Sequence, residues 1–440
     1  MPGPVGMEPA SGATLDASRR VAQLGSPPRV VVAAAFMEFL IPSRTARPAD
    51  DPIFALNAEA QARKKSGEPV INATVGALLD DDGKLAVIGA VVEALRSVPP
   101  EVGAAYAPIA GPAAFLQGVI DDLFAGRPEA ALSTAVATPG GTGALRHAIT
   151  TFLEPQQMLL TTGFYWSPYK TLADEADRTL ATFRMFDDKG RLDVSDFERK
   201  LGGVLDAQGR ALVFLNTPCH NPTGYSLDEK DWSGLCDVVG RAASRGPITV
   251  LLDVAYGRYA KQGLGESFAP ALRLADKAML LFAWSASKSF TQYGLRVGAL
   301  VALCPDPAER ARVQNALTYA SRGTWSNCNA AGMNAIARVL TDPELRARVD
   351  AERATWKDLL DRRVERWNTL APAAGLGYPR CDGGFFTTVF CEDAPRVAAR
   401  LREEGIFVVP VQGALRVGLC SVPERDIERL VDGLRRATNP

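Results

Sequence analysis

Short apolar runs alternate with amphipathic stretches between about residues 130 and 305. Each run reads as a strand buried on both faces, because its residues are almost continuously apolar and do not alternate with polar ones. The stretches between them have helical spacing, and strands joined by helices usually run in the same direction. The pattern therefore predicts a mainly parallel sheet covered by helices. The predicted strands are residues 131–137, 158–162, 211–216, 248–253, 278–284 and 298–304.

The pattern changes in the last hundred residues. Residues 343–370 carry apolar side chains at near-helical spacing among many charges, which predicts one long amphipathic helix that joins two domains. Residues 385–390 and 414–420 look like strands, and residues 423–437 like a closing helix. Together with some residues near 60–95, this part predicts a smaller α+β domain.

The chain has 440 residues, which exceeds one ordinary hydrophobic core and favours two closely joined domains. The first 50 residues are rich in Pro, Gly, Ala and Ser, and we expect them to be partly disordered or draped over a partner. The expected division is an N-terminal arm, a small domain in two pieces, and a large domain between the pieces. Its boundaries are 1–55 for the arm, 56–100 and 346–440 for the small domain, and 101–345 for the large domain.

The composition of the chain argues against several classes of function. A net charge of -1 argues against a nucleic-acid or anionic-membrane partner. Seven cysteines without a Cys-x-x-Cys pair, and only two histidines, favour a reducing cytoplasm over a disulfide framework or a zinc site. The apolar stretch 30–41 contains Glu38 and is too short to span a bilayer, and it lacks the flanks of a signal peptide. We expect a cytoplasmic enzyme without a metal.

Three charged residues near the ends of predicted strands indicate the chemistry. Lys288 follows the run 278–284, Asp253 ends the run 248–253, and Arg296 lies eight residues after Lys288. An isolated lysine is more often a solvated loop residue, such an aspartate is often a helix cap, and such an arginine often forms a surface ion pair. Together they match pyridoxal phosphate (PLP): an amine that holds its aldehyde as an imine (Schiff base), a carboxylate for its ring nitrogen and a cation for its phosphate.

Further residues fit the same cofactor. The Gly-rich segment 138–145, between a strand and a helix, offers backbone N–H groups to a phosphate, although most such turns are only tight turns. Ser285 and Arg296 could meet at the same phosphate. Asn221 and Tyr256 could donate to the phenolic oxygen of the ring. Trp166 could stack on the ring face, although aromatic clusters more often belong to a core.

These motifs resemble the aspartate-aminotransferase type (class I/II) of PLP-dependent enzyme, and the resemblance extends from about residue 71 to 437. It implies fold type I: an α/β large domain with a mainly parallel seven-stranded sheet between helices, plus a smaller α+β domain. It also implies a homodimer. The resemblance assigns cofactor contacts to Gly141, Thr142, Trp166, Asn221, Asp253, Tyr256, Ser285, Lys288 and Arg296, with Lys288, Asp253 and Tyr256 catalytic.

Four more residues take roles from the resemblance. Gly76 lies in a segment similar to the one that closes over substrate, and Asn221 and Trp166 would also contact the substrate. Tyr106 would reach across the dimer to the partner's cofactor phosphate. Arg416 would grip the substrate α-carboxylate with its planar fork. Arg322 would cross the dimer to a side-chain carboxylate, which implies a dicarboxylate substrate such as glutamate or 2-oxoglutarate; alternatively, it pairs within the interface.

The sequence also departs from the family pattern. Gly140 stands where a serine is common, Asn216 and Tyr169 stand where histidines often support the ring-pairing aspartate, and no role falls to Cys219 or Cys328. Two reactions remain open. The first is transamination between an α-amino acid and a 2-oxo acid; the second is a lyase or synthase reaction on the same scaffold. Both begin with removal of the Cα proton by the freed lysine. A DNA-binding regulator and a dehydrogenase are disfavoured, because neither a basic helix-turn-helix pattern nor a Gly-x-Gly-x-x-Gly fingerprint is found.

Overall fold

The computed structural model describes residues 39–48 and 52–438, and the chain divides into a short unit, 1–49, and a compact unit, 50–440. In the short unit, Pro42–Arg44 forms a single 3-10 turn. The expectation that the first 50 residues are partly disordered or cover a partner falls mostly outside the described residues.

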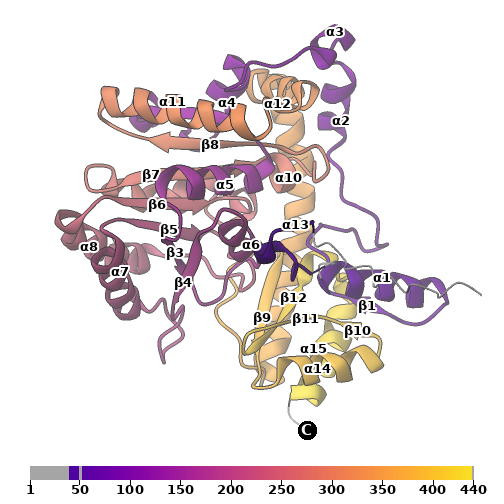
Figure 1. Cartoon of the computed structure of the whole chain (residues 1–440). Coiled ribbons are helices and arrows are strands. Elements are labelled where there is room, and N and C mark those ends of the chain that lie inside the picture. The colour runs from indigo at the N-terminus through magenta and orange to yellow at the C-terminus, as the bar shows by residue number, and fades with distance from the viewer. Residues whose placement is uncertain (1–38, 49–51, 439–440) are drawn as a thin grey trace, which may run out of the picture. The chain divides into compact units, whose positions relative to one another are not determined.

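A seven-stranded sheet forms the centre of the compact unit (Figure 1), with strand order β2-β8-β7-β6-β5-β3-β4. Strand β8 pairs antiparallel with both of its neighbours, whereas all other neighbours in the sheet are parallel. This mainly parallel sheet confirms the predicted α/β fold class. Its strands are β2 (Ser133–Pro139), β3 (Met158–Thr162), β4 (Thr179–Phe183), β5 (Ala211–Asn216), β6 (Ile248–Asp253), β7 (Met279–Ser285) and β8 (Val297–Leu303).

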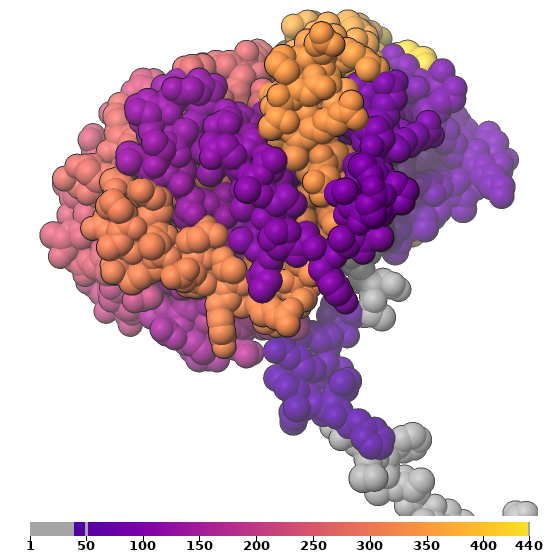
Figure 2. All heavy atoms as spheres, turned by 90° about the horizontal axis from the view of Figure 1, so that it is seen from above, coloured from indigo at the N-terminus to yellow at the C-terminus, as the bar shows by residue number. Residues whose placement is uncertain are grey.

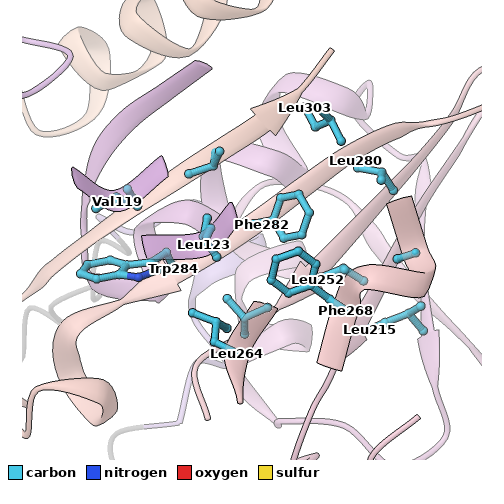
Figure 3. Packing of buried hydrophobic residues seen from close by; sticks show 14 of the residues in the cluster. Val119, Leu123, Leu215, Leu252, Leu264, Phe268, Leu280, Phe282, Trp284 and Leu303 are labelled. Carbon is cyan, nitrogen blue, oxygen red and sulfur yellow. The ribbon is translucent and has the colours of Figure 1, made fainter. Parts of the chain in front are cut away.

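Helices cover both faces of this sheet, because successive side chains of a strand point to opposite faces. Val250 and Leu252 join the core on one face, and Leu251 joins the core on the other. Figure 3 shows the first of these cores, where Phe268 and Phe282 pack beside Leu252. The first face is covered by α4 (Ala113–Phe124), α7 (Val194–Gln208), α8 (Glu229–Ala242) and α12 (Ala330–Thr341), and the second by α5 (Gly140–Phe152), α6 (Pro168–Glu175) and α11 (Pro307–Thr324).

A second, smaller core lies on a three-stranded antiparallel sheet of order β11-β12-β9. Trp367, Leu415 and Leu430 are fully buried there. A short parallel pair, β1 with β10, lies beside α1. The elements are β1 (Ile71–Asn72), β9 (Phe386–Phe390), β10 (Ile406–Phe407), β11 (Val409–Val411), β12 (Ala414–Gly418), α1 (Pro52–Lys65), α14 (Ala394–Glu403) and α15 (Ile427–Thr438).

Helix α13 (Pro343–Ala373) connects the two cores. Val349 near its beginning packs into the core of the large sheet, and Val364 packs into the smaller core. Two buried arginines on it bond to backbone: Arg353 Nε donates to the carbonyl of Ser289 at 2.6 Å, and Arg363 Nη1 to that of Cys420 at 2.9 Å. The remaining helices are α2 (Gly89–Arg96), α3 (Pro100–Ala104), α9 (Leu264–Phe268) and α10 (Ala286–Ser289).

Candidate active site

A cavity of about 370 Å³ lies beyond the C-terminal ends of β5, β6 and β7, where side chains from separate strands meet. Nine residues that were predicted from the sequence line it, together with Asn216. Three larger grooves, of about 460, 720 and 740 Å³, contain none of these residues. The predicted residues in the cavity wall are Gly141, Thr142, Trp166, Asn221, Asp253, Tyr256, Ser285, Lys288 and Arg296.

Asp253 is a buried carboxylate at the end of β6. Oδ2 accepts a hydrogen bond from the hydroxyl of Tyr169 at 2.8 Å, and Oδ1 accepts one from the backbone N–H of Ala255 at 3.3 Å. Within residues 52–438 it has no ion-pair partner. Burial raises its pKa to about 6, although the Tyr169 bond lowers it. An acid held this way favours a cationic partner from the cavity side.

Asn216 and Asn221 brace the next wall of the cavity. Asn216 donates from Nδ2 to the carbonyl of Asp253 at 2.8 Å and accepts from the backbone N–H of Asn221 at 2.6 Å. The Asn221 amide then donates from Nδ2 to the Tyr256 hydroxyl at 3.4 Å. Burial raises the pKa of Tyr256, so its hydroxyl stays protonated and can donate in turn. The pair presents two neutral donors at one place.

Lys288 lies on α10, in the first turn after β7. Its Nζ donates to the carbonyl of Gly76 and lies 4.5 Å from the centre of the Tyr293 ring. Burial lowers the pKa of this amine to about 8. A large share of the lysine is therefore an uncharged nucleophile at mildly alkaline pH.

Ser285, Arg296 and the loop at the start of α5 lie together at another end of the cavity. Arg296 Nη2 donates to the carbonyl of Pro139 at 3.2 Å, which brings the guanidinium against this loop. Gly140 has φ of +73°, and a Cβ there would overlap that guanidinium. The turn requires glycine for both reasons. Backbone amides of a helix N-terminus, a serine hydroxyl and an arginine together suit a phosphate.

Arg416 lies on β12, behind the segment that carries Gly76. It is buried, donates from Nη2 to the carbonyl of Thr74 at 2.7 Å, and lies 4.6 Å from the centre of the Phe386 ring. Neither Gly76 nor Arg416 lines the cavity itself, although the Lys288–Gly76 bond connects their segment to it.

Tyr106 and Arg322 lie away from this cavity. The Tyr106 side chain is 92% exposed, and it makes no hydrogen bond among residues 52–438. Arg322 is exposed near the end of α11 and donates to the hydroxyl of Ser326 at 2.6 Å. One chain therefore does not bring either residue to its own cavity.

Phe54, Ala255, Ser287 and Tyr293 also line the cavity, and the sequence analysis gave none of them a role, whereas Leu145 closes the predicted segment 138–145. Phe54 lies on α1 and is 73% exposed. The proline at the first position of that helix was an available signal for a helix start. Ala255, Ser287 and Tyr293 had no such signal, because each is an ordinary residue within a few positions of a predicted site residue. The residues that the structure describes contain no group of His, Cys, Asp and Glu that could hold a metal.

Comparison with known proteins identifies the family. Residues 68–434 match the model of "Aminotransferase class I and II". The chain is 28% identical over 388 residues to an aromatic-amino-acid aminotransferase of Paracoccus denitrificans, covering 86% of this chain and 95% of the relative. It is 32% identical over 337 residues to an aspartate aminotransferase of Pseudomonas aeruginosa, covering 73% and 80%.

Solved structures agree. An aminotransferase from Anaerococcus prevotii superposes with a TM-score of 0.87 at 31% identity, covering 92% of this chain and all of that one. An aromatic-amino-acid aminotransferase from Burkholderia pseudomallei, covalently bound to pyridoxal phosphate, superposes with a TM-score of 0.75 at 26% identity, covering 91% and 100%.

Fold and comparisons together define a PLP enzyme of fold type I. Within that class, the chain belongs to the class I and II aminotransferase family. It is a PLP-dependent aminotransferase that acts on an amino acid and a 2-oxo acid, and the lyase or synthase alternative is not favoured.

Proposed function

We propose that the cavity residues divide the binding of PLP among themselves. Gly141, Thr142, Ser285 and Arg296 would hold the phosphate, and Tyr106 of a partner subunit would join them. Asn221 and Tyr256 would donate to the phenolic oxygen, Trp166 would lie against the ring face, and Asp253 would face the ring nitrogen. Lys288 would be the amine that receives the aldehyde.

The observation that carries this assignment is that the Lys288 amine and the Asp253 carboxylate line one cavity. The carboxylate is buried without a cation, and a protonated pyridine nitrogen supplies one. Gly140 leaves room for the Arg296 guanidinium beside the helix N-terminus. These features fit the aldehyde, the ring nitrogen and the phosphate of the cofactor, one feature for each group.

The bound cofactor supplies an aldehyde for amino groups and a ring that stabilises negative charge at the substrate Cα. Lys288 would take the Cα proton and return it during transfer. A pKa of about 8 suits a base that must accept and release a proton near neutral pH. The Gly76 carbonyl would orient the amine through their hydrogen bond.

Two arginines would recognise substrate. Arg416 would bind the α-carboxylate that all α-amino acids share, because a buried guanidinium fork matches a carboxylate with two bonds. Arg322 would reach the partner's cavity and bind a side-chain carboxylate, so that an acidic amino acid or 2-oxoglutarate is one substrate. Its exposure, with no ion-pair partner among residues 52–438, supports this role.

The working assembly would be a homodimer. Tyr106 and Tyr319 are 92% and 83% exposed, which is unusual for aromatic side chains without a partner. Tyr319 belongs to α11, whose orange surface faces the viewer in Figure 2 beside the purple N-terminal segments. Dimer formation would cover these rings and bring Tyr106 and Arg322 to the second cavity.

Two further expectations remain proposals. The large domain would comprise 101–345, and the small domain 56–100 with 346–440. The location would be cytoplasmic, which seven cysteines that are all free support. No helix of the described chain is long and apolar enough to cross a membrane.

Transamination is tested by mixing the PLP-loaded enzyme with single amino acids. Loss of the visible absorption band, with a stoichiometric release of 2-oxo acid and a pyridoxamine-like spectrum, is expected. Ammonia release without an amino acceptor would contradict the proposal. The panel includes glutamate, aspartate, phenylalanine, tyrosine and leucine, so that the same experiment reports substrate preference.

Arg416→Ala tests the carboxylate role. We expect kcat/KM to fall on the order of 100-fold or more for every α-amino acid, because a buried charge-assisted pair is lost. Arg416→Lys keeps the charge without the planar fork and should recover only part of the activity. PLP affinity, measured by absorbance titration, should stay unchanged in both variants. Unchanged kcat/KM in Arg416→Ala would refute the role.

A further inference from the structure

The last turn of α11 carries Arg322 between two residues that contact the same histidine. Ser321 immediately precedes Arg322, and its Oγ lies 3.0 Å from Nε2 of His147 on α5. Trp325, three residues after Arg322, stacks on the His147 ring with centroids 4.1 Å apart and an interplanar angle of 27°. His147 and Ser321 are both fully buried.

Helical geometry explains what this contact controls. Ser321 lies in the last turn of α11 and Trp325 is the residue directly after the helix, and their contacts with His147 place both side chains against α5. Arg322 follows Ser321 by one position and therefore points about 100° away, towards solvent. The backbone N–H groups of Trp325 and Ser326 both donate to the Ser321 carbonyl, at 3.1 and 3.0 Å, and close the turn. Because the inner face is held at two points, rotation of this turn is restrained, and so is the direction in which Arg322 leaves the backbone.

This contact leaves polar atoms unsatisfied. Nδ1 of His147 and Nε1 of Trp325 are buried without a hydrogen-bond partner among the described residues. A buried polar atom without a partner destabilises the folded state, because it has lost its hydrogen bond to water. Burial also lowers the pKa of His147 to about 4, so the ring is neutral at physiological pH. A phenylalanine would stack without that cost but could not bond to Ser321, which points to the hydrogen bond as the reason for the histidine.

We propose that His147 is a positioning residue for substrate specificity: it orients Arg322 towards the partner's cavity and thereby favours dicarboxylate substrates. This inference rests on the role proposed above for Arg322. His147 touches neither the cavity nor Arg322 itself, so it acts through Ser321 and Trp325. His147 lies on α5, two turns after Gly140, where the phosphate is proposed to bind. It therefore connects that end of the helix to Arg322.

The test uses the full-length PLP-loaded enzyme and five variants, one of which is Arg322→Ala. His147→Phe keeps a flat ring and removes Nε2, Ser321→Ala removes the hydroxyl, and His147→Gln restores a polar group near Nε2. Ile149→Val is the matched control, because it alters a fully buried side chain on the same helix without touching the contact. The half-reaction with glutamate, and separately with phenylalanine, is followed by absorbance without an acceptor, so that no second dicarboxylate enters.

We expect the apparent dissociation constant for glutamate to rise about three- to tenfold in His147→Phe and Ser321→Ala, which is the value of one hydrogen bond. The limiting rate and the phenylalanine constant should stay unchanged, and His147→Gln should lie between. Hydrogen exchange in residues 321–327 should become faster in the first two variants. Ile149→Val should change neither the substrate constants nor this exchange.

Three results would overturn the inference in distinguishable ways. An equal loss for glutamate and phenylalanine would mean that His147 only stabilises the fold. If Arg322→Ala weakens glutamate and His147→Phe does not, the positioning role alone is wrong. If Arg322→Ala leaves the glutamate constant unchanged, the role proposed for Arg322 fails, and the inference fails with it.

Discussion

At the scale of single residues, the surroundings of Asp253 distinguish this site. A tyrosine, Tyr169, donates to its Oδ2, and Asn216 donates to its backbone carbonyl. The family resemblance leads to histidines at both positions. Burial, followed by the nearby Asp253 charge, raises the pKa of Tyr169, so this donor stays neutral. The carboxylate thus has a supporting bond without a competing cation.

Asp253 should make the stability of the cofactor-free enzyme depend on pH. Its folded pKa of about 6 exceeds the ordinary value of 3.8. Between about pH 4 and 6 the unfolded chain therefore loses this proton first, and stability falls as pH rises. Asp253→Asn should remove this decrease, on the order of 1–3 kcal/mol. Urea unfolding of both proteins from pH 4 to 8 measures the difference, and parallel curves would contradict the assignment.

Tyr169→Phe should extend the same decrease to higher pH. Loss of the hydroxyl removes a bond to the ionised form and raises the pKa of Asp253 further. At pH 7 the cofactor-free variant should lose about 1.5–3 kcal/mol, the usual value of a hydrogen bond to a charged group. The double variant with Asp253→Asn is the control, because there the tyrosine no longer meets a charge. A loss of equal size in that background would show that only packing had changed.

Lys288→Ala should abolish the visible absorbance of the protein-bound cofactor and lower turnover by more than about a thousandfold. The side chain contacts the Gly76 carbonyl and three aromatic rings, and no buried ion pair is lost among the residues described. The circular dichroism spectrum should therefore stay that of the wild type. Covalent cofactor retained in this variant would count against the assignment.

The site residues that could be predicted from the sequence are those whose functional groups the cofactor requires. Residues that only complete the wall of the cavity could not be predicted. Lys288, Asp253 and Asn221 carry groups that the cofactor needs and stand next to buried runs, and they line one cavity. Phe54 and Tyr293 also line the cavity, but no proposed step of binding or catalysis requires their side-chain groups. Such residues are placed by packing over long sequence distances, which no local pattern records.

At the scale of elements, strands buried on both faces were the most predictable. The runs 158–162, 211–216 and 248–253 match β3, β5 and β6 residue for residue. Strand β4 was missed because it is a half-exposed edge strand of five residues with two threonines. The run 131–137 began too early, since the chain to Leu132 forms a 3-10 turn. The antiparallel direction of β8 could not be predicted, because a run of apolar residues looks the same in a parallel and in an antiparallel buried strand.

The close packing between the β2–α5 loop and Arg296 can be tested by substitution of Gly140. Gly140→Ala should weaken PLP binding at least tenfold, because the new Cβ would displace the Arg296 guanidinium as well as strain a left-handed backbone. Gly190→Ala is the matched control: its φ of +71° is nearly the same as the +73° of Gly140, but its Cβ would meet open space. It should cost stability alone. Equal cofactor affinities in the two variants, measured by titration of absorbance, would refute the crowding argument.

At the scale of the whole molecule, two chains that are each impaired with glutamate should complement each other if Arg322 acts across a dimer. In a mixed dimer of Lys288→Ala and Arg322→Ala, the site with an intact lysine receives Arg322 from the other chain. Random mixing in equal amounts should give about a quarter of all sites this complete set. Glutamate turnover should rise above the average of the two separate variants after joint refolding. An average value would place Arg322 within its own subunit or outside the site.

Helix α13 connects the turn that carries Lys288 with the smaller core. Arg353 holds the carbonyl beside the lysine-bearing turn, and ten residues along the same helix Arg363 holds the carbonyl of Cys420. These anchor points are about 15 Å apart on one continuous rod. A tilt of this helix would move both carbonyls together, because each is bonded to the same rod. We therefore expect a movement at one end of α13 to be transmitted to the backbone at the other end. Loss of either arginine hydrogen bond should weaken this coupling.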